Sequence, residues 1–249
     1  MSSTYQQLNT SLEFLKLFQM KKHLEEVSDF VIKNKLSFSD GLLKLCNYEI
    51  DYKSEVASKS MIKAAAFPFV KTIEDYDFEF QPCVSKQEIL ELASLRFMDN
   101  SENIVFLGNS GVGKTHLATS IGIVAASKRY STYFIKCHEL LQQLKRAKLE
   151  NRLENKLKYI NRYKLLIIDE LGYLTIDKED SNLFFQLIDM RYEKKSTILT
   201  TNINFNEWDN IFYDAVVANA ILDRILHHSK VITINGRSYR VKDYIKVQE

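Results

Sequence analysis

Apolar residues in the first quarter of the chain recur every three or four positions, the spacing of one helix face. One such stretch runs from Leu8 to Val31, and a second covers residues 40–66. The break between them, with Ser39 or Asp40 as the N-cap of the second stretch, is typical of a turn between two helices. The pattern predicts a small all-helical N-terminal domain over residues 1–66.

Beyond residue 100 short apolar runs alternate with helical patterns. Strands are expected at 104–107, 132–136, 165–169, 197–201 and 231–234, and helices at 115–127, 138–162, 179–194 and 214–229. Strands that alternate with helices form a parallel sheet covered on both faces. The predicted fold class is therefore α/β, with a parallel sheet flanked by helices.

Residues 67–86 separate the two patterns and contain both prolines of the chain, Pro68 and Pro82, with five aromatic residues. So many aromatic side chains favour packing against the protein over exposure to solvent. We therefore expect an ordered linker over 67–86, followed by a second domain over 87–249.

Composition excludes several classes of protein. The 249 residues are 45% hydrophobic and 27% charged, as in an ordinary globular protein, and the net charge of +2 indicates no partner. No apolar run reaches the roughly 18 residues of a membrane span, and no secretory signal is visible, so we expect a cytoplasmic protein.

Three cysteines without a CxxC pair predict neither disulfides nor zinc. His227 and His228, if helical, point about 100° apart and make a poor metal pair.

Three of the seven glycines fall in one loop, which fits the pattern G-x-x-x-x-G-K-[ST] between a strand and a helix. Its residues are Gly108, Asn109, Ser110, Gly111, Val112, Gly113, Lys114 and Thr115. The backbone N–H groups of such a loop form an anion nest, the lysine reaches the β- and γ-phosphates, and the threonine hydroxyl holds Mg²⁺. The motif predicts ATP binding; the alternative is a glycine turn with a surface lysine.

Three further candidate residues lie at the ends of predicted strands. Asp169 ends the run LLIID, where open α/β sheets bind ligands, and is placed to hold Mg²⁺. Glu170 beside it could orient and deprotonate a water molecule, or be a solvated loop carboxylate. Asn202 follows the strand TILTT. If that strand lies between the strand before the glycine loop and the strand LLIID, Asn202 faces the γ-phosphate; otherwise it is a turn asparagine.

The basic run at residues 145–164 carries eight Lys or Arg and two Glu. Interleaved tyrosines make it a candidate for phosphate contacts with DNA, while a solvated helix face with Glu–Lys pairs is the alternative. Scattered further candidates are Lys63, Lys71, Arg237, Lys242 and Lys246.

Five segments of the chain, taken in order, closely resemble the IstB-like transposition helper ATPases. They are GNSGVGKTHLA, LLIIDELGYL, TTNINFNEW, ILDRILHHS and GRSYR. These are relatives of the DnaC helicase loader among the AAA+ ATPases. The resemblance extends to FPFVKTIEDYDFEFQP and LSFSDGLLKL, and so covers nearly the whole chain. It implies a P-loop AAA+ core without a full lid domain after the helical N-terminal domain.

The resemblance also implies residue roles. ATP would be bound by the loop residues 108–115 with His116 and Asp169, and Mg²⁺ by Thr115 and Asp169. The implied catalytic residues are Glu170 as catalytic glutamate, Asn202 as sensor, Arg224 as an arginine finger for a neighbouring subunit, and Arg240 as a second sensor. From the residues alone, Arg224 could instead form a salt bridge with Asp223 or Asp214.

The function that the resemblance implies is a DNA-dependent ATPase. It would assemble with ATP into an oligomer on duplex DNA, deliver a partner transposase, and disassemble on hydrolysis, with no membrane contact. A DnaC-like helicase loader is the main alternative, and the N-terminal segment favours transposition. A small-molecule kinase is a more distant alternative, since the Asp–Glu pair, Asn202 and Arg224 speak against it.

Overall fold

The computed structural model describes residues 3–241, which fall into two compact units that divide between Ser60 and Met61. The boundary lies within the helix α3 (Phe38–Ala64). Each unit is described by itself below. Of the scattered basic candidates, Lys242 and Lys246 lie outside the described residues.

The N-terminal unit consists of α1 (Thr4–Phe14), α2 (Phe18–Asn34) and the first part of α3. The apolar periodicity continues past residue 15, but the chain breaks there because Lys16 has φ 56°, which ends α1. The predicted N-cap of α3 was wrong: Ser37 caps it, and its hydroxyl accepts from the Asp40 N–H at 3.2 Å.

The core of this unit is small, and the residues buried in it are Leu12, Met20, Leu24, Val27 and Leu45. Glu49 on α3 is also buried, and its Oε2 accepts from the backbone N–H groups of Gln19 and Met20 at 2.7 and 3.1 Å. A carboxylate from one helix thus satisfies the free donors at the start of α2.

Five strands form the sheet of the second unit, all parallel and in the order β2-β3-β4-β1-β5. Their bounds are β1 (Asn103–Gly108), β2 (Thr132–Lys136), β3 (Leu165–Leu171), β4 (Ser196–Thr201) and β5 (Ser229–Ile234). The predicted α/β class with a parallel sheet is confirmed. Because β4 lies between β1 and β3, the condition set for Asn202 is met.

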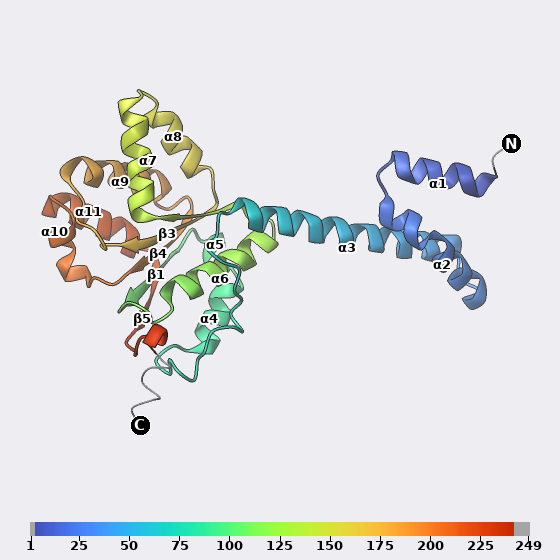
Figure 1. Ribbon diagram of the computed structural model, residues 1–249, viewed down its shortest axis with the longest axis horizontal. Coiled ribbons are helices and arrows are strands. Elements are labelled where there is room, and N and C mark those ends of the chain that lie inside the picture. Colours follow the sequence, from blue (N-terminus) through green and yellow to red (C-terminus); the bar gives the residue numbers. More distant parts are fainter. Residues whose placement is uncertain (1–2, 242–249) are drawn as a thin grey trace. The chain divides into compact units, whose positions relative to one another are not determined.

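Alternate residues along β1, β2, β3 and β4 enter two different cores, so helices cover both faces of the sheet (Figure 1). Ile104 and Phe106 of β1 pack toward α6 (Lys114–Ser127), together with α4 (Lys86–Ala93) and α5 (Arg96–Asp99). Val105 packs into the opposite core. Helices on that face are α7 (Cys137–Leu149), α8 (Leu153–Asn161), α9 (Lys178–Arg191), α10 (Trp208–Ile211) and α11 (Ala215–Leu226).

The single helix expected over 138–162 is two helices. Asn151 adopts φ 54° between them, and the Arg152 N–H bonds the Ala147 carbonyl at 2.8 Å to close the end of α7. Short helices α4, α5 and α10, and the 3-10 turns at Phe205–Glu207 and Tyr239–Val241, were not predicted. Over residues 3–241 no helix combines the length and apolar character needed to cross a membrane.

Candidate functional site

The glycine loop joins the carboxyl end of β1 to the first turn of α6, as its motif requires. Gly111 and Gly113 have φ 82° and 97°, a region that favours glycine. Both are also closely packed: a Cβ at Gly111 would lie 2.0 Å from Oγ of Ser238, and one at Gly113 would lie 2.5 Å from the Tyr76 ring. Segments far along the chain on either side therefore hold the loop.

Lys114 is the first residue of α6 and points back over the loop. Its Nζ donates to the carbonyl oxygens of Gly108 and Asn109, both at 2.7 Å. Burial lowers the pKa of Lys114; the negative charge of Asp169 opposes this shift and the positive charge of Arg240 adds to it. A partly buried cation whose hydrogen bonds go to neutral carbonyls can exchange these partners for an anion.

Asp169 is buried at the end of β3 and gathers hydroxyl groups from two other elements. Its Oδ1 accepts from Oγ1 of Thr115 at 2.8 Å and from Oγ1 of Thr200 at 2.5 Å. Burial raises the pKa of Asp169, and these two hydrogen bonds oppose the shift. A hydroxyl and a carboxylate side by side are oxygen donors of the kind Mg²⁺ prefers, so the donor set fits this ion.

Glu170 lies at a break in the sheet register. The pairing of β3 with β4 shifts between Ile168 and Leu171, and Glu170 has φ 60°. Its N–H donates to Oγ1 of Thr200 at 2.9 Å, and its carboxylate forms an ion pair with Nζ of Lys136 at 2.9 Å. The bulge turns Glu170 out of the strand, toward the cavity and the end of β2.

A cavity of about 410 Å³ brings most of the predicted site together, and its size is within the range of small-ligand pockets. The predicted residues that line it are Ser110, Gly111, Val112, Gly113, Lys114, Thr115, His116, Glu170, Asn202 and Arg240. Gly108, Asn109 and Asp169 lie beside it through their bonds to Lys114 and Thr115.

The segment before α4 supplies a wall that sequence reasoning did not predict. Its residues in the cavity are Phe69, Lys71, Asp75, Tyr76, Asp77 and Gln81. The Tyr76 hydroxyl donates to the Val112 carbonyl at 2.9 Å, and His116 Nε2 lies 2.8 Å from the Thr72 carbonyl. On the other side, the Tyr239 N–H donates to the Gly111 carbonyl at 2.8 Å, which brings Arg240 to the cavity.

Thr200 and Lys136 were also missed. Thr200 is two residues after the buried Ile198 and so shares its face of β4, but only the strand order shows that this face adjoins Asp169. Lys136 ends β2, and its register partner on β3 is Asp169. Period-two alternation, combined with a correct sheet order, would have found both.

Arg224 is the one predicted catalytic residue that the structure places away from the cavity. Its Nε donates to Oδ1 of Asp189 on α9 at 2.8 Å, and its guanidinium lies 4.6 Å from the Phe185 ring centre. The sequence offered Asp223 or Asp214 as partners, and this was wrong. Asp214 instead caps α11 through the Val216 N–H at 2.8 Å.

The basic run meets more acidic groups than its own sequence contains. Ion pairs hold five of its cations: Lys145 with Asp177 and Asp180, Lys148 with Glu179, Arg146 and Arg152 with Glu150, and Lys158 with Glu154. The remaining cations lie over tyrosine rings, Lys156 and Arg162 over Tyr159 and Lys164 over Tyr130. The run is therefore largely neutralised, since α9 and the residue before it supply three of the carboxylates.

Comparisons with known proteins show which family this chain resembles. The family model for IstB-like ATP binding proteins matches residues 10–247. An ATP-binding protein named for insertion sequence IS232 of Bacillus thuringiensis subsp. berliner is 65% identical over 244 residues, 98% of each chain. One named for IS21 of Pseudomonas aeruginosa is 40% identical over 237 residues, 95% of this chain and 89% of the relative.

Solved structures show the fold. The DnaC helicase loader superposes with a TM-score of 0.55 at 23% identity, over 66% of this chain and 96% of its own. DnaI superposes with a TM-score of 0.57 at 20% identity, over 71% and 93%. These likenesses confirm the predicted fold of the sheet domain, a parallel sheet flanked by helices. The family model matches nearly the full length, and relatives are 65% and 40% identical, so the chain belongs to the IstB-like ATP-binding proteins.

Proposed function

We propose that this protein is an ATP-hydrolysing transposition helper that assembles with ATP on duplex DNA and recruits or stimulates a partner transposase. The observation that carries the ATPase proposal is the single cavity shared by Lys114, Thr115, Glu170, Asn202 and Arg240. The transposition proposal rests on the two relatives described above, which are named for insertion sequences. This chain aligns with 98% and 89% of their lengths.

In the proposed reaction the loop amides and Lys114 hold the phosphates of ATP, and Lys114 gives up its two carbonyl partners to do so. Thr115 and Asp169 would hold Mg²⁺, which neutralises phosphate charge when bound. Asn202 orients a water molecule whose oxygen attacks the γ-phosphorus of ATP while the bond from that phosphorus to the bridging oxygen breaks and ADP leaves. Glu170 accepts the proton of that water. Arg240 contacts the phosphates from the same chain, because it lines the same cavity as Lys114.

We propose that Arg224 completes the site of a neighbouring subunit. It lies outside its own chain's cavity, and a guanidinium supplied in trans can neutralise the charge that develops during phosphoryl transfer. Arg224 would exchange Asp189 for the neighbour's γ-phosphate. The pair with Asp189 is partly exposed, so its loss costs little, roughly 0–1 kcal/mol.

We propose that three cations of the basic run make the DNA contacts. Lys156, Arg162 and Lys164 have tyrosine rings as neighbours where the other cations have carboxylates, so they are the cations available for phosphates. Changing these three to Ala should reduce the slope of log K against log salt by about 0.9 each. The matched triple, Lys145, Arg146 and Lys148 to Ala, removes ion-paired cations and should change the slope less. Equal slopes for the two triples would contradict this assignment.

A helicase loader is the second candidate, favoured by the fold shared with DnaC. Glu170→Gln distinguishes the two while testing hydrolysis. The variant keeps the shape of the side chain, so ATP binding should persist while turnover falls about 10²-fold or more. Its ATP-bound assemblies should then accumulate on duplex DNA and retain a partner transposase. Normal turnover would contradict the role of Glu170, and a preference for single strands and a replicative helicase would favour the loader.

The compartment proposed for this activity is the cytosol. Cys46, Cys83 and Cys137 are all free in the structure. Free thiols at these three exposures, from exposed to buried, are typical of a reducing compartment.

A further inference from the structure

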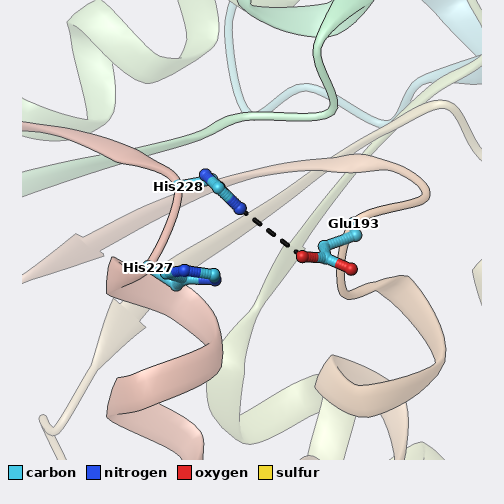
Figure 2. A group of neighbouring side chains, drawn as sticks. All are labelled: Glu193, His227 and His228. Atoms are coloured by element: carbon cyan, nitrogen blue, oxygen red, sulfur yellow. Dashed lines mark ion pairs between the residues drawn. The ribbon is translucent and has the colours of Figure 1, made fainter.

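Two adjacent histidines and a glutamate gather on the sheet domain, outside the nucleotide cavity. Figure 2 shows Glu193, from the turn after α9, facing His227 and His228 at the end of α11. Two histidines within a helix would diverge, but α11 ends at Leu226 with His227 as its C-cap, and His228 lies in the turn before β5 begins at Ser229. In the intervening turn the two ring centres lie 4.0 Å apart.

The three side chains offer donor atoms at a spacing close to that of a metal site. One ligand atom from each residue lies within 4.8 Å of the other two, and His228 Nε2 is 3.5 Å from Oε1 of Glu193. Tetrahedral zinc with bonds of about 2.0–2.1 Å needs donor atoms about 3.3 Å apart. All three residues are exposed, so small side-chain rotations reach this spacing without repacking a core.

Tyr192 adds the outer partner that metal-binding imidazoles usually have. Its hydroxyl lies 2.6 Å from Nδ1 of His227, and the two rings stack with centres 5.9 Å apart. A hydrogen bond at one ring nitrogen fixes the orientation of the ring and leaves the other nitrogen for a ligand. His227 Nε2 is therefore the atom it would offer.

We propose that Glu193, His227 and His228 form a binding site for a divalent metal ion of the Zn²⁺ type. Two imidazoles and one carboxylate suit such an ion, whereas Mg²⁺ and Ca²⁺ prefer oxygen ligands. Three protein ligands leave a fourth position open for water or another group. The site is one helical turn beyond Arg224, whose guanidinium lies 6.0 Å from the Tyr192 ring.

Competition with a chromophoric chelator tests the site on the full chain, with Zn²⁺ as probe and any affinity tag removed. Millimolar Mg²⁺ occupies oxygen sites such as Asp169, and the Cys83→Ser background removes the exposed thiol. We expect one Zn²⁺ per chain at micromolar concentration. His227→Ala and His228→Ala should each weaken binding at least about tenfold, and Glu193→Gln and Tyr192→Phe should weaken it less.

His138→Ala is the matched control, because His138 forms an exposed pair with Glu139 at 3.9 Å. It should leave zinc affinity unchanged. Co²⁺ in place of Zn²⁺ should give the visible absorption of a four-coordinate site, and His228→Ala should abolish it. The proposal is overturned if no stoichiometric zinc binds, if both histidine variants bind like the parent protein, or if His138→Ala weakens binding equally. Circular dichroism of each variant separates these results from loss of fold.

Discussion

The nucleotide cavity and the α9–α11 surface, which carries Asp189 and Arg224, place their charged groups in different surroundings. In the cavity, Lys114 donates to backbone carbonyls, and Asp169 accepts from two hydroxyls. Burial lowers the pKa of Lys114 and raises the pKa of Asp169, so in each case it favours the neutral form of the side chain. On the α9–α11 surface, Arg224 is partly exposed and already paired with Asp189.

The difference separates a site prepared within one chain from a group that, in the function proposed above, acts on a second chain. Buried charges with only neutral partners are poorly stabilised, so an oppositely charged ligand gains much from meeting them. A surface pair exchanges one partner for another at little cost. We therefore expect substitutions in the cavity to affect ATP binding, and substitutions at Arg224 to affect only what happens between subunits.

The largest effect is expected for Lys114→Ala, which removes the cation of the cavity. ATP binding measured by calorimetry should be lost, while the melting temperature should change little because Lys114 is not part of a core. Lys128→Ala, at the exposed end of the same helix, is the matched control and should bind ATP normally. Equal affinity of Lys114→Ala and the parent protein would refute the assignment of the phosphate loop.

Arg224→Ala should bind ATP nearly normally and lose about 10³-fold or more in hydrolysis. Mixing it with Lys114→Ala tests whether the site is shared. Some interfaces in the mixture pair an intact phosphate loop with an intact arginine, so ATPase activity should rise and then fall with the mixing ratio.

Arg240→Ala provides the control for this mixing experiment. Arg240 and Lys114 line the cavity of one chain. No interface in a mixture of Arg240→Ala and Lys114→Ala therefore contains a complete site, and activity should not recover. Recovery with Arg240→Ala, or none with Arg224→Ala despite crosslinked mixed oligomers, would reverse the comparison between the two regions.

The smallest effect is expected for Lys136→Met, which frees Glu170 from its ion pair. Both side chains are more than a third exposed, so the pair contributes at most about 1 kcal/mol. Basal turnover should therefore rise by no more than about fivefold with ATP affinity unchanged. Lys136→Arg keeps the charge and should behave like the parent protein. A fall in turnover for Lys136→Met would instead make Lys136 a group that the reaction needs.

Local patterns determined the parts of this protein whose structure depends on neighbours in sequence. Glycines that permit a positive φ, a lysine at a helix start and an apolar strand before Asp169 require only residues a few positions apart. The phosphate loop, the alternation of strands with helices and the position of Asn202 after a strand were therefore predictable. The alternation of strands with helices did not give the order of the strands in the sheet. Whether Asn202 faces the γ-phosphate depended on that order.

The tertiary structure decided every feature that joins distant parts of the chain. Tyr76 packs against Gly113, and Thr200 binds both the Asp169 carboxylate and the Glu170 amide. Carboxylates at the start of α9 neutralise Lys145 and Lys148, which looked like free positive charge in the sequence. The physical reason is the same throughout. Periodicity reports which way a residue faces on its own element, but its partners, burial and effective charge depend on which element packs opposite.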